Sequence, residues 1–241
     1  MGSATFVLIH GGGHGGWCWQ PVADLLRAKG HQVHAPTLTG LAERANEIPL
    51  DIGLETHVAE VAALLEALAP APVVLVGHSY GGMVICGAAD RAAGRVARLV
   101  FLDAAIAEQG EALIDISPAL SVLAEDVVEV DGVLLGLWPD ERALQIYGLS
   151  GELAEQALER LTPHPWNCFT DHLHLRDPAA LRRIPRALLN CKGTLERRPA
   201  VRRHRWSEGD IVETIDAPHD VMLTHPALVA DFLTRLVSPQ G

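Results

Sequence analysis

The sequence predicts one α/β domain, in which a mostly parallel β-sheet is covered by helices on both faces. Short apolar runs of strand character, such as TFVLI at residues 5–9, alternate with segments of helical spacing, such as residues 54–68. This alternation is typical of βα units, whose strands are buried on both faces of the sheet. The chain has 241 residues, of which 49% are hydrophobic, so it is long and apolar enough to form one large core.

Each expected element follows from its own residues. In residues 54–68, Val58, Val61 and Leu65 share one face of a helix, which is the face that would pack on the sheet. Gly30 marks the end of the first helix, and Pro36 stops the second strand. The expected strands are 5–9, 32–35, 73–76, 98–102, 186–191 and 210–215, and the expected helices are 21–28, 54–68, the stretch after residue 80, 199–206 and 226–237.

The segment from residue 108 to residue 183 has a different character. Strand runs give way to helical spacing with scattered prolines, most clearly at residues 153–161. The sequence therefore predicts a core made of residues 1–107 and 184–241. A mostly helical cap, residues 108–183, would be inserted into this core after the strand at 98–102.

Residues 73–87, VVLVGHSYGGMVICG, combine a strand, a sharp turn and a helix around one serine. Gly77 and Gly81 lie two residues before and after Ser79, where side chains would make the strand and the helix collide. The helix would aim its first N–H groups at the serine oxygen. We therefore predict that Ser79 is a nucleophile, rather than a surface serine in a glycine-rich turn.

A serine nucleophile needs a base, and in a parallel sheet that base should come from the carboxyl end of a strand. His219 follows the last expected strand directly, whereas His204 and His225 lie in, or at the start of, expected helices. We predict that His219 is the general base.

Two backbone N–H groups are expected to bind the oxyanion. One belongs to Tyr80, the residue after the nucleophile, and the other to Gly12 in the glycine-rich loop that follows the first strand. The same loop could serve as a phosphate loop, but the required G-K-[ST] pattern does not follow it. We expect His10 to order this loop rather than to react.

The carboxylate that would orient His219 has two candidates. Glu196 is the only carboxylate in the loop after the strand ending at Cys191, and Arg197 and Arg198 could instead hold it in a surface pair. Asp103 follows the strand after the nucleophile helix, where it could also serve only to form a turn. Either strand end can supply the geometry. We rank Glu196 first and keep Asp103, or no third member, as alternatives.

Charge and cysteine content exclude several classes of protein. The net charge is −11 without acidic blocks, which argues against nucleic acid or an anionic membrane as a partner. Four scattered cysteines without a C-x-x-C pattern favour reduced thiols and a cytoplasmic location. From these residues we expect neither a signal peptide nor a membrane span, and we expect neither a metal nor an organic cofactor.

Taken together, five stretches resemble the α/β-hydrolase branch that contains plant methyl-ester esterases, hydroxynitrile lyases and their bacterial esterase relatives. They are FVLIHGGGHGGWCW (6–19), GHQVHAPTLTGLAER (30–44), LVGHSYGGMV (75–84), LVFLDA (99–104) and PHDVMLTHP (218–226), and the resemblance spans nearly the whole chain. It implies the α/β-hydrolase fold, with Ser79 as nucleophile, His219 as base, and the N–H groups of Gly12 and Tyr80 as oxyanion donors.

The resemblance also bears on the acid. Relatives carry it in a Cys-x-x-Asp loop at a fixed distance before a tryptophan. Counting back from Trp206 leads to Glu196, whereas counting forward from Cys191 leads to Thr194, so this loop departs from the family pattern.

The same resemblance separates esterases from lyases. The lyases carry threonine directly after the first loop histidine, and lysine directly after the catalytic histidine to hold the cyanide. Here these positions are Gly11 and Asp220. A carboxylate beside the leaving group would repel cyanide, so we expect no lyase activity.

The combined prediction is a serine hydrolase that cleaves a small, fairly apolar carboxylic ester or lactone through an acyl-enzyme. A non-hydrolytic biosynthetic enzyme of the same fold (a lyase or cyclase) and a ligand-binding protein are the alternatives. The sequence leaves the oligomeric state open, a homodimer included. We expect apolar and aromatic pocket walls, with His14, Trp17, Trp138 and Trp166 as the main candidates, and Tyr80, Leu134, Leu137 and Phe169 as further ones.

Overall fold

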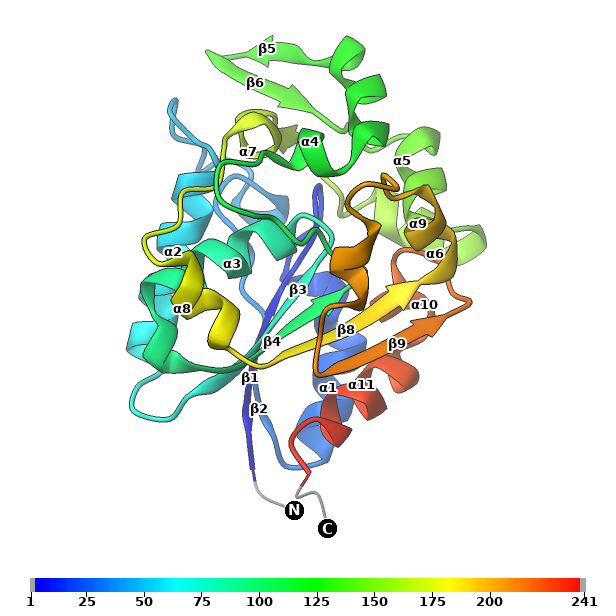
Figure 1. The fold of residues 1–241 in the computed structure, drawn as a ribbon. Coiled ribbons are helices and arrows are strands. Elements are labelled where there is room, and N and C mark those ends of the chain that lie inside the picture. The colour runs from blue at the N-terminus through cyan, green and yellow to red at the C-terminus, as the bar shows by residue number, and fades with distance from the viewer. Residues whose placement is uncertain (1–2, 239–241) are drawn as a thin grey trace.

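Six strands form a central sheet in the order β2-β1-β3-β4-β8-β9, and all neighbouring strands are parallel. The structure is a computed structural model that describes residues 3–238 (Figure 1). The predicted fold class is confirmed, and each predicted strand is present. The strands are β1 (Thr5–Ile9), β2 (Gln32–His34), β3 (Val73–His78), β4 (Val96–Leu102), β8 (Arg186–Cys191) and β9 (Ile211–Ile215).

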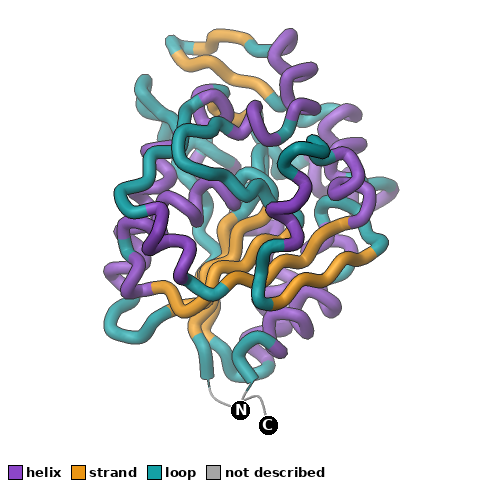
Figure 2. Tube along the Cα trace, viewed as in Figure 1, coloured by secondary structure: helices purple, strands orange, loops and turns teal. Residues whose placement is uncertain are grey.

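Helices cover both faces of the sheet, as Figure 2 shows. Alternate residues of β1 enter two separate cores: Phe6 and Leu8 pack with α1 and α11, whereas Val7 and Ile9 pack with α2 and α3. This alternation is the two-residue period of a strand that is buried on both sides. The covering helices are α1 (Gln20–Ala28), α10 (Val221–Thr224) and α11 (Pro226–Arg235) on one face, and α2 (Leu54–Ala67), α3 (Gly81–Arg91) and α8 (Pro178–Arg183), which packs on α3, on the other.

The inserted segment lies over the carboxyl ends of the strands (Figure 1). It contains α4 (Leu113–Ile116), a 3₁₀ segment (Pro118–Asp126), α5 (Glu141–Tyr147), α6 (Gly151–Leu158) and α7 (Asn167–Thr170). It also contains an antiparallel sheet that the sequence analysis missed, formed by β5 (Val128–Val130), β6 (Val133–Gly136) and β7 (His164–Pro165). These strands have 3, 4 and 2 residues, too few to show a two-residue period in the sequence.

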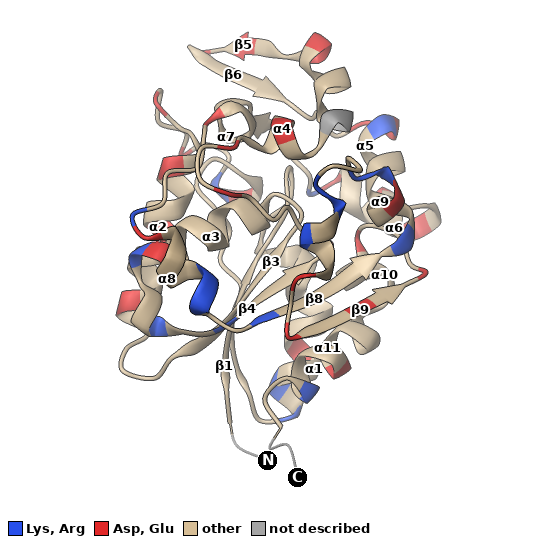
Figure 3. Cartoon of the chain, in the orientation of Figure 1, with Lys and Arg blue, Asp and Glu red and all other residues tan. Residues whose placement is uncertain are grey.

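Charged side chains gather on the outer helices and loops, and β1 and β3 at the centre of the sheet carry none (Figure 3). Within residues 3–238, no helix combines the length and the apolar character needed to cross a bilayer. The four cysteines are unpaired, and all of them are buried.

Candidate active site

Ser79 lies at the tip of the turn between β3 and α3, with a backbone φ of +52°. Only a few per cent of non-glycine residues adopt a positive φ, and such strain is typical of functional sites. A Cβ atom at Gly77 would lie 2.6 Å from the carbonyl oxygen of Gly81, and one at Gly81 would lie 2.7 Å from that of Ile9. The strand and the helix therefore meet closely enough to require both glycines, and this contact holds the serine in its strained conformation.

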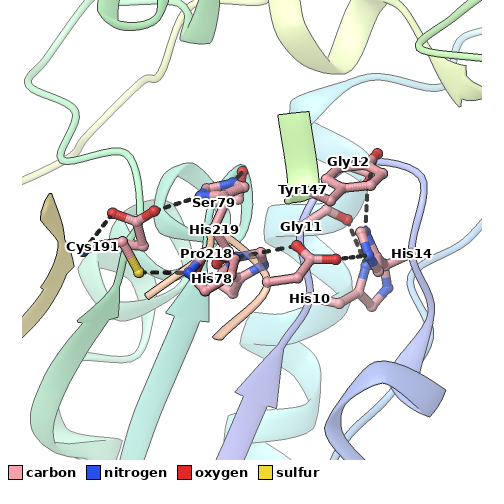
Figure 4. Close-up of polar contacts among 12 residues, drawn as sticks. His10, Gly11, Gly12, His14, His78, Ser79, Tyr147, Cys191, Pro218 and His219 are labelled. Carbon is pink, nitrogen blue, oxygen red and sulfur yellow. Dashed lines mark hydrogen bonds and ion pairs between the residues drawn. The ribbon is translucent and has the colours of Figure 1, made fainter. Parts of the chain in front are cut away.

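His219 lies beside Ser79 (Figure 4), and its ring connects Ser79 to Asp103. Its Nε2 atom lies 3.0 Å from Ser79 Oγ, and its Nδ1 atom lies 2.5 Å from Asp103 Oδ2. Because a carboxylate only accepts hydrogen bonds, Nδ1 carries the proton and Nε2 is free to accept from the serine hydroxyl. The three residues follow β3, β4 and β9, whose carboxyl ends meet at one edge of the parallel sheet.

Asp103 is 2% exposed and has a backbone φ of +45°. Its Oδ1 atom accepts a hydrogen bond from the Cys191 N–H at 3.1 Å. Burial alone would raise the pKa of this carboxyl, but His219 and the buried Arg198 guanidinium outweigh it, and the pKa is lowered. Arg198 is held in place by hydrogen bonds to the Asp103 and Ala104 carbonyl oxygens, each 3.3 Å long. Asp103 is therefore ionised at neutral pH.

Glu196, which we ranked first as the acid, does not reach His219. The residues after β8 form helix α9 (Lys192–Arg197), and this helix directs Glu196 to the surface, where it is exposed. Thr194, at the position where the family pattern expects the acid, instead helps to lower the pKa of the Asp103 carboxyl. The structure thus corrects the ranking and places Asp103, the second candidate, against the histidine ring. The helix expected at 199–206 is also corrected, to a 3₁₀ turn at Arg203–Ser207.

The glycine-rich loop lies against the serine. A Cβ atom at Gly11 would lie 2.9 Å from Ser79 Cβ, and one at Gly12 would lie 2.8 Å from Leu137 Cδ2. Among residues 3–238, no group accepts a hydrogen bond from the N–H of Gly12 or from that of Tyr80 at the start of α3. Both N–H groups are therefore available to a ligand.

Four buried histidines surround this loop in neutral form. His10 donates from Nδ1 to the Gly11 carbonyl (2.9 Å) and accepts the Leu38 N–H at Nε2 (3.0 Å). His78 donates from Nε2 to the His219 carbonyl at 3.1 Å. Burial lowers the pKa of His10 and of His78 to about 3. Burial also lowers the pKa of the other two, His57 and His164.

His57, His164 and Cys168 bring potential metal-ligating atoms within 4.8 Å of one another. Their hydrogen bonds do not suit a metal. His164 accepts the Gly13 N–H at Nδ1 (3.1 Å), which leaves its other nitrogen protonated. His57 has its Nδ1 atom 2.8 Å from the Tyr80 hydroxyl, which occupies the lone pair that a metal would need. We therefore read this cluster as a hydrogen-bonded part of the core.

His14 and Asp220 form a fully buried pair, with His14 Nε2 2.9 Å from Asp220 Oδ2. This placement corrects two expectations. His14 is 0% exposed and is no pocket wall. Asp220 is 0% exposed and faces His14, so its carboxylate does not lie exposed beside a leaving group as expected.

The three tryptophans expected in the pocket serve mainly in packing. Trp17 stacks on His14 with ring centroids 5.4 Å apart, Trp138 donates to the Asp126 carbonyl at 2.8 Å, and Trp166 is 7% exposed. The cap side chains that lie against Gly12 are Leu137 and Phe169, whose nearest atoms would be 2.8 and 2.9 Å from a Cβ atom there. Nothing in the sequence ranked these two above the tryptophans.

Comparison with known proteins shows which proteins this chain is similar to. The pattern that describes the alpha/beta hydrolase family matches residues 6–232. The chain is 38% identical to the carbendazim hydrolyzing esterase of Nocardioides sp. over 185 residues, which cover 77% of this chain and 70% of that protein. It is 29% identical to esterase PIR7B of Oryza sativa subsp. japonica over 261 residues, which cover 97% and 95% of the two chains.

Solved structures show the same fold at lower sequence identity. Polyneuridine aldehyde esterase superposes with a TM-score of 0.78 at 23% identity, covering 98% of this chain and 100% of that one. The Arabidopsis methylesterase MES16 superposes with a TM-score of 0.74 at 22% identity, covering 97% and 98% of the two chains.

Proposed function

This chain belongs to the alpha/beta hydrolase family, and we propose that it is an esterase that cleaves small, fairly apolar carboxylic esters or lactones at Ser79. The observation that carries this proposal is the continuous hydrogen-bonded path from Ser79 Oγ through the His219 ring to Asp103, at 3.0 and 2.5 Å. The esterase names of its relatives support the reaction class.

In the proposed first half-reaction, Ser79 Oγ attacks the ester carbonyl carbon while its proton passes to His219 Nε2. Asp103 stays ionised and stabilises the imidazolium that forms. The free N–H groups of Gly12 and Tyr80 bind the oxyanion. Collapse of the intermediate breaks the bond between the carbonyl carbon and the alkoxy oxygen, and the proton on His219 goes to the leaving alcohol.

In the second half-reaction a water molecule attacks the acyl carbon and gives one proton to His219. Breakage of the acyl–Ser79 bond then returns this proton to Ser79 Oγ and releases the acid. The proposed sequence of steps balances without a metal or an organic cofactor.

Leu137 and Phe169 support a small, apolar acyl group. Both side chains are apolar, and both lie directly against Gly12, so they limit the space beside the proposed oxyanion site. The geometry at Gly11 speaks against a hydroxynitrile lyase. Its Cβ position, 2.9 Å from Ser79 Cβ, leaves no room for the threonine of those enzymes.

The test is hydrolysis of p-nitrophenyl acetate by Ser79→Ala, with a fluorophosphonate probe as a second readout. We expect kcat/KM to fall by at least about a thousandfold while the melting temperature is retained. We also expect the probe to label the unmodified chain at Ser79. Turnover that persists in Ser79→Ala would reject the covalent mechanism. A wild-type serine that stays unlabelled would favour a ligand-binding protein.

A further inference from the structure

A closed ring of four hydrogen bonds joins the glycine-rich loop, the cap and the loop that carries His219. Figure 4 shows Gly12, His14 and Tyr147, which are three of its members. The Gly12 carbonyl accepts from the Tyr147 hydroxyl at 3.0 Å and from His14 Nδ1 at 2.8 Å. His14 Nε2 then bonds Asp220 Oδ2 at 2.9 Å, and the Asp220 N–H donates to the Tyr147 carbonyl at 3.0 Å. The ring ties together segments that are more than 70 residues apart, because it links positions 12–14, 147 and 220.

The partners of His14 determine its charge. Its Nδ1 atom faces a carbonyl oxygen and its Nε2 atom faces a carboxylate oxygen, and neither partner can donate a hydrogen bond when the carboxylate is ionised. Both ring nitrogens must then carry protons, so His14 is an imidazolium ion. Burial would lower the pKa of His14, but Asp220 outweighs it and the pKa is raised; the pKa of Asp220 is correspondingly lowered.

This ring acts on the residue whose N–H is expected to bind the oxyanion, because it holds the carbonyl oxygen of Gly12. The N–H of Gly12 belongs to the same peptide unit as the Gly11 carbonyl, which His10 holds at 2.9 Å. In a trans peptide the N–H points away from the C=O, so holding the Gly11 carbonyl aims the Gly12 N–H. The Gly12 carbonyl is held on the other side by His14. Glycine has the greatest backbone freedom, and these two contacts remove it here.

We propose that His14, kept as an imidazolium by Asp220, is a positioning residue that fixes the backbone of Gly12 for oxyanion binding and holds it at a fixed position relative to His219. This inference rests on the ester hydrolysis proposed above. Hydrogen bonds from a charged donor are about twice as strong as those between neutral groups. The Tyr147 hydroxyl makes the neutral bond to the same carbonyl oxygen, which provides an internal comparison.

Other titratable groups do not replace the carboxylate of Asp220. Among residues 3–238, Asp220 is the acidic side chain that raises the pKa of His14, whereas the neighbouring His10, His78 and His164 are buried with lowered pKa values. Without that carboxylate, burial would drive His14 to lose a proton near neutral pH. The neutral ring would then keep only one of its two donors. The remaining groups that face the pair are His219, Cys18, Tyr147 and, across Trp17, Arg160.

The first test reads the charge of His14 in the wild-type chain. The protein is labelled with ¹⁵N-histidine, and the ring nitrogens are observed by NMR at pH 8, with His14→Gln used to assign the His14 signals. We expect two protonated nitrogens on His14, and one on His10, His57 and His78. A His14 ring with a single proton at pH 8 would overturn the proposal, and this measurement needs no active variant.

The second test compares kinetics of three variants. In Asp220→Asn, kcat for p-nitrophenyl acetate should fall roughly tenfold to a hundredfold, with KM changed by less than about twofold, because the oxyanion forms only in the transition state. Tyr147→Phe, which removes the neutral bond, should cost less than about fivefold. Asp216→Asn, in the same loop but exposed, should match the wild type.

The outcomes separate this proposal from the proposed function. If the wild type hydrolyses esters and Asp220→Asn keeps its kcat, or if Tyr147→Phe costs as much as Asp220→Asn, the positioning role is wrong while the esterase stands. If no ester is turned over, the esterase proposal fails, and the NMR result still decides whether His14 is charged. If Asp220→Asn does not fold, the same NMR result on the wild type decides the question.

Discussion

Replacement of Asp103 by asparagine tests the choice between the two carboxylates. Asparagine keeps the size of the side chain but removes its charge. In the transition state Asp103 faces an imidazolium, and its oxygen lies 2.5 Å from His219 Nδ1. In Asp103→Asn, the imidazolium loses this partner in a site where the residue is only 2% exposed.

The magnitude follows from Coulomb's law. With charge centres about 4 Å apart and an effective dielectric constant of about 20, the lost attraction is about 4 kcal/mol. Each 1.36 kcal/mol corresponds to about a factor of ten in rate, so kcat should fall about a thousandfold. An amide group that donates toward Nδ1 would also favour the wrong tautomer of His219, which makes the loss larger.

The assay is hydrolysis of p-nitrophenyl acetate at pH 8, with circular dichroism to check the fold. Glu196→Gln is the matched control. It also removes one carboxylate charge, but its side chain is exposed on α9, so we expect activity within about twofold of the wild type. The reasoning would be refuted if Glu196→Gln lost activity and folded Asp103→Asn kept more than a tenth of it.

Three further predictions concern pH, thiols and the cap. Burial lowers the pKa of His10 and of His78 to about 3. Below pH 6.5 the unfolded chain then binds more protons than the folded chain. As the pH falls from 6.5 to about 3, each of these two histidines should therefore lower the free energy of unfolding by roughly 1.4 kcal/mol per pH unit. Urea unfolding at pH 7, 6 and 5 measures this slope, and a flat profile would contradict it. Burial raises the pKa of all four cysteine thiols, that of Cys86 to about 11, so a disulfide reagent at pH 8 should modify them only after urea is added. Leu137→Ala, beside Gly12, should raise the butyrate-to-acetate ratio of kcat/KM about threefold to tenfold, whereas Val122→Ala, which is 65% exposed on the cap, should leave it unchanged.

Most of the core could be predicted because its signals are local. The apolar run of β3, the glycines around Ser79 and the spacing of Val58, Val61 and Leu65 in α2 each reflect contacts of neighbouring residues with one sheet. The cap was harder to predict. Its strands have two to four residues and are defined by pairing with distant segments, so its sheet has no local signature.

The carboxylate that orients His219 shows why part of the site could not be predicted from the sequence. Both Glu196 and Asp103 follow parallel strands, and the sequence holds no direct measure of the distance from either to His219. The decision came from α9, which turns Glu196 outward, and from the pairing of β4 with β8, which brings the Cys191 N–H to Asp103.

The sequence by itself determined the parallel sheet, the turn that presents Ser79 and the position of His219 after the last strand. These features depend on residues that are close along the chain, or on the rule that parallel strands end at one edge. The tertiary structure alone decided which carboxylate meets His219 and that His14 pairs with Asp220. Both are contacts over more than 100 residues of sequence, at 2.5 and 2.9 Å, and only the packed arrangement of the loops brings such atoms together.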